Sequence, residues 1–324
     1  MTIKFALESA ALWPSPSTGQ ATEKANNIRF LDFWRRYGVF FMNSNTQPIN
    51  DALEVMPQPI RKLWQAALLS EGFRKVDYYN ENNEDFFNTP EILLNNFHDV
   101  DIACVEADTA SKYLPKDEYC GFFENKKPEI CRFDCVDSSN QVIKFRNLWD
   151  QIIPSGTSRD NIWKDRFHGL TFFAKRIAII DRYCGKSISQ CYTEGRLSGT
   201  TFFLKLLSQI PGDIKNKSIS IYTSDKDVDI SDIQASLEKQ LKVNKKNIAS
   251  VRLYIAQDRE FSKISHDRFL RFDNIVTSIG KGISLFEHAS CKENFSCAIQ
   301  NDDGSFKAHI ESFLQNVSSS YSIK

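Results

Sequence analysis

Residues 265–282, SHDRFLRFDNIVTSIGKG, hold the side chains best suited to chemistry on a phosphate group. The imidazole of His266 can attack phosphorus, because an unperturbed pKa of about 6.5 leaves it mostly neutral at physiological pH. Arg268 can hold phosphate oxygens with two parallel N–H donors. Gly280 and Gly282 have no Cβ, so the backbone there can come close to a bound group. The segment therefore predicts a phosphate site.

The position of His266 depends on the strand that follows it. If DRFLRFD (267–273) is extended, alternate residues face the same way, so His266, Arg268, Leu270 and Phe272 share one face. Such a strand would present the imidazole and the guanidinium side by side. Both would lie where a loop enters a strand, and helix-covered sheets gather their chemistry at such places.

The sequence before this segment alternates between strand and helix patterns. Apolar runs with β-branched residues predict strands, and apolar residues at helical spacing predict helices. The expected elements are a helix at 161–174, a strand at 176–181, a helix at 200–210, a strand at 218–224, a helix at 231–241 and a strand at 251–256. This order predicts a sheet covered by helices.

Shorter apolar segments follow, and they predict hairpin strands along one edge of that sheet. The segments are 268–272, 274–279 and 294–299, and after them a last helix has Ile310, Phe313, Leu314 and Val317 on one face. In the strand at 251–256, the period of two predicts that Arg252 and Tyr254 face outward.

The N-terminal half is rich in Asn, Pro and aromatic residues and has a less regular pattern. Residues 28–41 predict a buried helix that Gly38 ends before a short strand. Residues 59–69 predict a second helix and 99–108 predict a strand. This half therefore predicts an α/β or mostly α domain.

Pro, Gly and Ser residues at 152–160 separate the two halves. We expect two domains, residues 1–155 and residues 156–324, because a chain of 324 residues exceeds the usual size of one domain. The fold class is α/β, and the C-terminal domain has a mixed sheet flanked by helices. The function of the N-terminal domain is open, and it can serve as the surface for a protein partner.

Acidic residues in the N-terminal half offer a second chemistry. They are Asp99, Asp101, Glu106, Asp108 and Asp134. Paired carboxylates can hold Mg²⁺ in a two-metal nuclease. Acids at strand ends and in loops are also common for solvation alone, so we expect no metal here. The alternative is that this half is itself a nuclease-like domain.

The composition restricts where the protein acts. Lys+Arg and Asp+Glu balance at 41 each, so any binding of a polyanion must come from a local patch. Glu8 interrupts the first apolar stretch, which argues against a signal peptide. The longest apolar run, LTFFAKRIAII, is broken by Lys175 and Arg176 and is shorter than the roughly 18 residues of a spanning helix. We expect a cytoplasmic protein without a membrane span.

Cysteines are numerous for such a protein. The eight are Cys104, Cys120, Cys131, Cys135, Cys184, Cys191, Cys291 and Cys297. Without an export signal, they are expected to remain thiols. Cys131 and Cys135 form one close pair, with Cys120 and His98 nearest to it, whereas a structural zinc usually needs two pairs. We expect buried, unligated thiols.

The segment HDRFLRFDNIVTSIG resembles the phosphodiesterase motif of the phospholipase D superfamily, usually written HxKxxxxD with a following Gly-Ser. The strands and helices from KRIAIIDRY to about residue 300 are similar to that superfamily's half-domain. The resemblance covers less than half of the chain and leaves the N-terminal half unrecognised. Its arginine form, HDR, is also similar to a phospholipase D-like binding domain attached to microtubule-interacting and trafficking modules, and to modules of bacterial conflict and mobile-element proteins.

The resemblance implies a role for each matching residue. His266 would be the nucleophile, Arg268 would replace the phosphate-binding lysine, and Asp273 would be the structural acid. Glu293 would orient the imidazole. Lys281 stands where the motif has serine, and with Gly280 and Gly282 it would bind phosphate. No metal or cofactor is implied.

Two functions follow as hypotheses. The first is a metal-independent phosphodiesterase of the nuclease type, in which a homodimer supplies a second His266 as the acid that the leaving group needs. His168 and His288 are the other histidines considered for that acid. Basic and aromatic residues would then follow a nucleic-acid backbone: Lys263, Arg268, Arg271, Lys281, Lys292, Phe269 and Phe272. The second is a degenerate module that binds phosphate groups, nucleic acid or a protein without turnover.

Overall fold

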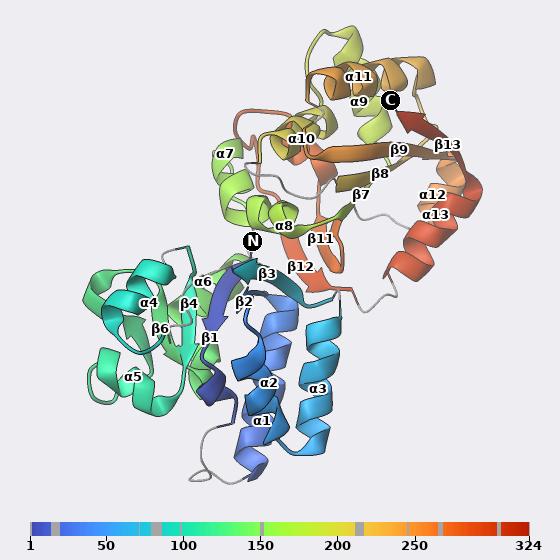
Figure 1. The fold of residues 1–324 in the computed structure, drawn as a ribbon. Helices are drawn as coiled ribbons and strands as arrows, with labels where there is room; N and C mark the ends of the chain where they lie inside the picture. The colour runs from blue at the N-terminus through green and yellow to red at the C-terminus, as the bar shows by residue number, and fades with distance from the viewer. Residues whose placement is uncertain are drawn as a thin grey trace. The chain divides into compact units, whose positions relative to one another are not determined.

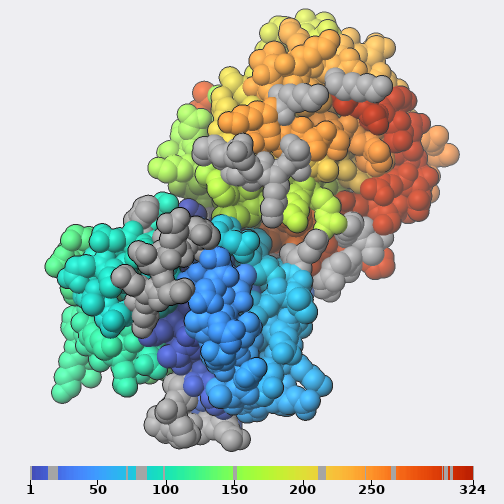
Figure 2. All heavy atoms as spheres, viewed as in Figure 1, coloured from blue at the N-terminus to red at the C-terminus, as the bar shows by residue number. Residues whose placement is uncertain are grey.

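The computed structural model describes residues 2–13, 20–70, 72–78, 86–97, 99–149, 152–210, 217–244, 246–264, 268–302 and 306–323. The chain forms two compact units, Thr2–Asn147 and Leu148–Lys324, and Figure 1 labels most of their helices and strands. Figure 2 shows all their atoms, the first unit blue to green and the second green to red. The division falls shortly before the predicted boundary after residue 155. Both units are mixed α/β, as the fold class predicted.

The N-terminal unit is built on a sheet of six strands in the order β3-β2-β1-β4-β6-β5. All neighbours are parallel except β5 and β6. The strands are β1 (Ile3–Leu7), β2 (Gly38–Asn43), β3 (Arg74–Tyr78), β4 (Ile102–Val105), β5 (Cys120–Phe122) and β6 (Glu129–Arg132). The predicted strands of this half are confirmed as β2 and β4, and the half is α/β rather than mostly α.

Helices connect these strands. They are α1 (Gln20–Arg36), α2 (Gln47–Glu54), α3 (Gln58–Leu69), α4 (Pro90–Asn96), α5 (Ala107–Tyr113) and α6 (Asn140–Trp149), with 3-10 turns η1 (Ser9–Leu12), η2 (Phe123–Asn125) and η3 (Phe133–Ser138). Phe5 of β1 stacks on Phe40 of β2 at 5.1 Å and meets the edge of Trp34 of α1 at 5.9 Å. A Cβ at Gly38 would lie 2.9 Å from the Trp34 Cα, so only glycine allows this close return from helix to strand.

The cysteines of this unit correct one expectation. Cys104, Cys131 and Cys120 face one another across β4, β6 and β5. Cys120 and Cys131 form a disulfide, with Cα atoms 4.2 Å apart. The prediction that every cysteine is a free thiol is therefore wrong for this pair. It was based on compartment alone and ignored that two cysteines directly opposite in an antiparallel pair are close enough to bond.

The C-terminal unit has a sheet of seven strands in the order β12-β11-β10-β7-β8-β9-β13. The central strands β7, β8 and β9 are parallel, and the outer pairs are antiparallel. The strands are β7 (Arg176–Ile180), β8 (Lys217–Ser224), β9 (Ile248–Ala256), β10 (Phe269–Phe272), β11 (Ile275–Ile279), β12 (Cys297–Asn301) and β13 (Ser318–Ile323). The expected mixed sheet with antiparallel strands at one edge is confirmed.

Helices cover both faces of this sheet. The helices are α7 (Arg159–Ile162), α8 (His168–Phe173), α9 (Cys184–Thr193), α10 (Gly199–Ser208), α11 (Ile230–Val243), α12 (Asp258–Ile264) and α13 (Ser312–Val317), with η4 (Trp163–Phe167), η5 (Gly282–Phe286) and η6 (Lys307–Glu311). On one face, Phe203 of α10 packs against Phe286 of η5 at 5.4 Å. On the other face, Phe261 of α12 and Leu314 of α13 pack on Ile180.

Two features of the C-terminal unit differ from expectation. Tyr254 was expected to face solvent, but it is buried and stacks on Tyr222 of the neighbouring strand at 4.7 Å. The helices α12 and α13 cover this end of the outer face, which a period of two cannot reveal. The strand β13 was not predicted, because its sequence SSSYSI has little apolar character. Among the helices that the structure describes, none combines the length and apolarity needed to cross a membrane.

Candidate functional site

The candidate site lies at the edge of the C-terminal sheet where the parallel strands end. The strands β7, β8 and β9 all run toward this edge, and β10 begins there because it is antiparallel to β7. Phe269 pairs with Ile180 and with Ser278, so the start of β10, the end of β7 and the end of β11 lie together. Open α/β sheets bind ligands outside the carboxyl ends of their strands, where strand order reverses.

The predicted nucleophile cannot be placed. His266 lies outside the described residues, and so does the predicted pairing of its imidazole with Arg268 on one face. Arg268 itself is the first described residue before β10, and its side chain is 23% exposed. The described residues on either side of it are Ile264, where α12 ends, and Arg268, just before β10 starts at Phe269.

Three groups orient the Arg268 guanidinium. Its Nε lies 3.6 Å from Oδ1 of Asp181, and an Nη atom donates to the carbonyl of Gly280. The guanidinium carbon lies 5.2 Å from the centre of the Tyr183 ring, within cation–π range. Arg268 is therefore a fixed, partly exposed cation, and one side of its charge already faces a carboxylate.

Asp181 is a site residue that the sequence reasoning missed. It directly follows the buried strand β7 and is 4% exposed. Its carboxylate accepts the backbone N–H of Tyr183 at 2.9 Å and that of Ile283 at 3.0 Å. Burial raises the pKa of the Asp181 carboxyl, although these N–H donors and the charge of Arg268 oppose the rise. An acid directly after four buried apolar residues of β7 was the signal that could have found it.

The glycines of the site pack against the protein's own side chains. Gly282 has φ +67°, and a Cβ there would lie 2.7 Å from Cγ of Asp181 and 2.5 Å from Cδ of Arg268. Gly280 lies against Ser296 in the same way. These glycines were predicted to make room for a phosphate. In the structure, Gly282 lets the backbone approach Asp181 and Arg268, and Gly280 lets it approach Ser296.

Lys281 and Glu293 pair with each other. The Lys281 ammonium and the Glu293 carboxylate form an ion pair, and both side chains are about half exposed. The structure therefore brings two predicted site residues together, each as the partner of the other. Both roles assigned by resemblance, phosphate binding by Lys281 and orientation of the imidazole by Glu293, remain predictions.

Asp273 lies at the opposite end of β10 from Arg268. It forms the β10–β11 turn with φ 52°, and its carboxylate accepts the backbone N–H groups of Lys175 and of Arg176, the latter at 2.9 Å. Asp273 thus joins the turn to the beginning of β7. These contacts with the backbone fit a structural acid, and they keep Asp273 away from the carboxyl edge.

The predicted basic and aromatic track is wrong at two positions. Arg271 is 4% exposed and pairs with the buried Glu311, and Phe272 is 3% exposed. Neither can contact a nucleic-acid backbone. Lys263 is accessible but binds Glu260 at 2.8 Å. Arg271 points to the opposite face from Arg268 because three positions separate them in an extended strand.

Arg182 is a second missed arginine at this edge. It forms two parallel hydrogen bonds to Asp258, at 2.7 and 2.6 Å, which lower the pKa of that carboxyl. Its guanidinium carbon lies 5.4 Å from the centre of the Tyr183 ring. Tyr183, which is 42% exposed, is therefore close to both Arg182 and Arg268. An aromatic ring beside two guanidiniums suits a flat or anionic ligand.

The other candidate groups are less well placed. His168 packs on Trp163 at the start of α8, at 6.0 Å between ring centres, and His288 is exposed after η5. In the N-terminal unit, Asp101 caps the start of β1 through the N–H of Lys4, and Asp134 binds Arg132. Among the described residues no three His, Cys, Asp or Glu side chains form a group that could hold a metal ion. His98 lies outside the described residues.

Comparisons with known proteins give little for this chain. No protein-family model matches it, and no curated protein matches it. One matching solved structure is described as TrmBL2, an archaeal chromatin protein with a novel mode of DNA binding. It shares 11% sequence identity over 52% of this chain and 52% of that chain, with a TM-score of 0.23. A TM-score of this size carries no inference about fold or function.

Proposed function

We propose that the C-terminal unit is a metal-independent phosphodiesterase that acts on nucleic acid at the carboxyl edge of β7. The observation that carries the proposal is Arg268, a partly exposed guanidinium held at this edge between Asp181, Gly280 and Tyr183. The edge is where α/β sheets bind ligands. Arg268 would hold the two non-bridging oxygens of a phosphodiester, and Tyr183 offers a ring for an adjacent base.

His266 would act as the nucleophile in this proposal. One imidazole nitrogen forms a bond to phosphorus, the bond to the leaving oxygen breaks, and a second histidine protonates that oxygen. Water then attacks the phosphohistidine, the nitrogen–phosphorus bond breaks, and the second histidine takes the proton from the water. A homodimer supplies the second histidine. No metal or cofactor takes part, and the sequence resemblance supports a bacterial defence or mobile-element context in the cytoplasm for this activity.

A second function has its own support. Arg268 already faces the Asp181 carboxylate, and Lys281 faces Glu293, so a phosphate must compete with protein carboxylates for both cations. Because these carboxylates already bind the two cations, the favourable free energy of binding a phosphate there is smaller. A module that grips a phosphate group at Arg268 without turnover is the alternative that this pairing favours.

One experiment tests the proposal and separates the two functions. Purified protein is incubated with single- and double-stranded DNA and RNA in the presence of EDTA, beside His266→Ala. Cleavage that survives EDTA and disappears in His266→Ala supports the phosphodiesterase. His309→Ala is the matched control, because that histidine is exposed on η6 and has no part in the proposal. Full activity in His266→Ala would remove His266 from the mechanism.

The oligomeric state and Arg268 complete the test. Light scattering during gel filtration is expected to show a dimer, and a strict monomer that still cleaves would refute the second-histidine role of a partner copy. Binding of labelled oligonucleotides without cleavage, lost in Arg268→Ala, would establish the binding module instead. Cleavage in His266→Ala that requires Mg²⁺ would point to the acidic residues of the N-terminal unit.

A further inference from the structure

Tyr183 is an exposed aromatic side chain at the edge that carries Arg268. It lies directly before α9, and 42% of its surface is exposed. The guanidinium carbons of Arg182 and Arg268 lie 5.4 and 5.2 Å from the centre of its ring. A phosphate bound to Arg268 would therefore have the Tyr183 ring beside it.

Hydrogen bonds fix the peptide group that joins Arg182 to Tyr183. The N–H of Tyr183 donates to the Asp181 carboxylate at 2.9 Å. The carbonyl of Arg182 accepts the hydroxyl groups of Thr223 at 3.2 Å and Ser224 at 3.0 Å. Because this backbone is already fixed, a ligand that packs on the ring has less of the protein to order, and ordering is one of the costs of binding.

The positive charges at this edge are paired with carboxylates. The pairs are Arg182 with Asp258, Lys186 with Asp227, Lys281 with Glu293 and Arg268 with Asp181. The Arg268 pair is the longest of these, with 3.6 Å between nitrogen and oxygen. Because paired cations attract a polyphosphate weakly, charge alone gives little affinity for a nucleic-acid backbone here. A contact with the base would have to add to it.

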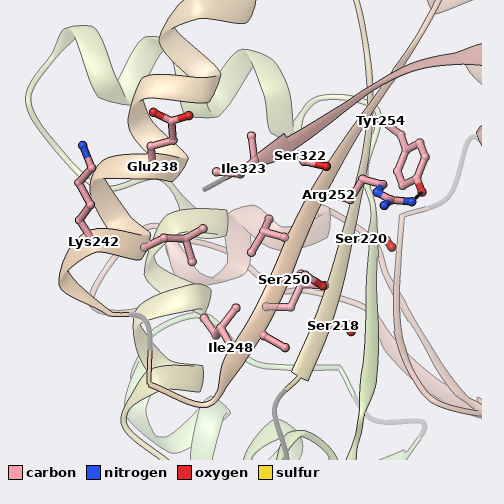
Figure 3. Close-up of a pocket in the computed structure, with 14 residues that line it drawn as sticks. Ser218, Ser220, Glu238, Lys242, Ile248, Ser250, Arg252, Tyr254, Ser322 and Ile323 are labelled. Atoms are coloured by element: carbon pink, nitrogen blue, oxygen red, sulfur yellow. Dashed lines mark hydrogen bonds between the residues drawn. The ribbon is translucent and has the colours of Figure 1, made fainter.

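Tyr254 on β9 is another tyrosine beside an arginine, but its ring is not available to a ligand. It is 7% exposed and stacks on Tyr222, with 4.7 Å between the ring centres. Figure 3 shows Arg252 donating to its hydroxyl, 3.5 Å away. In the parts of the chain that the structure describes, no aromatic ring packs on Tyr183. The Tyr183 ring can therefore receive a flat group from outside the protein.

A nucleic acid offers the face of a base only where the base is unpaired. In a duplex each base is stacked between its neighbours, and the grooves expose base edges alone. An unpaired base can leave its stack and pack on an aromatic ring, whatever its identity, because every base has such a face. The Tyr183 ring beside the Arg268 guanidinium therefore fits a phosphate that is joined to an unpaired base.

We propose that this edge takes single-stranded nucleic acid, and that Tyr183 selects it by packing on the base next to the phosphate held by Arg268. This inference rests on the proposed function, because it concerns the same edge and adds the class of its substrate. Tyr183 contacts the substrate without making or breaking a bond. A duplex offers its phosphates to Arg268 but no base face to Tyr183, so it is expected to bind more weakly.

The test measures binding of a labelled oligothymidine by fluorescence anisotropy in the presence of EDTA. The parent is the full chain with His266→Ala, so that cleavage does not consume the probe. Tyr183→Ala in this parent should weaken binding by about 5- to 150-fold, the range expected for the loss of one stacked base. Tyr183→Phe keeps the ring and should bind like the parent. The same strand without bases, and the matching duplex, should bind the parent more weakly and lose nothing further in Tyr183→Ala.

Tyr192 provides the matched control. It lies near the other end of the same helix, α9, and is 37% exposed. Tyr192→Ala removes the same kind of side chain and should leave the binding of oligothymidine unchanged. Urea unfolding of Tyr183→Ala and Tyr192→Ala checks that both variants remain folded.

Three results would overturn the inference: Tyr183→Ala binds oligothymidine like its parent, the strand without bases binds as tightly as oligothymidine, or the duplex does. These results are separate from the test of the proposed phosphodiesterase, which measures cleavage. Cleavage that depends on His266, together with binding that is unchanged in Tyr183→Ala, would keep that function and reject the base contact. Binding that depends on Tyr183 without any cleavage would reject the phosphodiesterase and support the base contact.

Discussion

Gly282→Ala should destabilise the C-terminal unit by two separable effects. The residue has φ +67°, and a left-handed conformation costs an L-residue about 1–2 kcal/mol. The added Cβ would also lie 2.7 Å from Cγ of Asp181 and 2.5 Å from Cδ of Arg268. Asp181 cannot move aside freely, because its carboxylate accepts two backbone N–H groups. Overpacking of this kind costs about 1–3 kcal/mol, so the total is about 2–5 kcal/mol.

A matched variant isolates the contact from the backbone effect. Gly195 lies in the same unit with φ +71°, and nothing lies within 4 Å of a Cβ placed there. Gly195→Ala should therefore cost only the backbone term, about 1–2 kcal/mol. Urea unfolding of both variants is followed by circular dichroism. If the dependence of the unfolding free energy on urea is the same in all proteins, the shift of the transition midpoint gives each loss of stability. Their difference, about 1–3 kcal/mol, measures the contact with Asp181 and Arg268.

The result that refutes this reasoning is an equal loss in the two variants. Equal losses of stability would mean that the backbone of residues 280–282 is not in close contact with Asp181 and Arg268. The arrangement of Asp181, Arg268 and Gly282 that we describe at the carboxyl edge would then be wrong. A larger loss of stability in Gly282→Ala than in Gly195→Ala would confirm it.

Two further predictions concern charges in the same unit. Arg271→Ala should lower the unfolding free energy in urea by about 3–5 kcal/mol, because it leaves the buried Glu311 without its partner. A double Arg271→Met, Glu311→Leu variant should recover most of that loss. Failure to recover it would contradict the ion-pair explanation. The hydrogen bonds from Arg182 lower the pKa of Asp258 in the folded protein. The ionised Asp258 therefore stabilises the fold at pH values above its unfolded-state pKa. This stabilisation is lost as the pH falls through the lower, folded-state pKa. In Asp258→Asn, the loss of stability between about pH 4 and pH 2 should be smaller than in the parent, and an unchanged acid profile would refute this.

Much of the C-terminal fold could be predicted from local patterns. The strand β7 consists of five residues, four of them buried, and the spacing of Ile233, Leu237 and Leu241 predicts α11. Such elements can be recognised in the sequence because each one buries apolar residues of its own segment. The strand β13 is different: its polar sequence is extended because it pairs with β9 over six residues. That pairing joins segments far apart in the chain, and no local pattern encodes it.

The candidate site was predictable only in part for the same reason. The spacing of His266, Arg268 and Asp273 marked the segment, and the strand β10 formed as expected. The neighbours that decide what Arg268 can do come from elsewhere in the chain. Asp181 follows β7, and Gly280 follows β11. Sequence spacing shows which residues lie near one another along the strand, but it does not show which acids neutralise them.

Arg268 and Arg271 show how strongly these distant partners matter. Both belong to the short segment RFLRF, and their side chains lie on opposite faces of the strand. Arg271 faces η6, where Glu311 pairs with it and both side chains are buried. Arg268 faces the end of β7, where Asp181 binds it but leaves it partly exposed. Because burial raises the pKa of Asp181, its carboxylate holds a proton more readily than an ordinary aspartate does. In the proposed function, protonation of Asp181 would remove the anion that competes with a phosphate, so the proposed affinity for phosphate would depend on Asp181 as well as on Arg268.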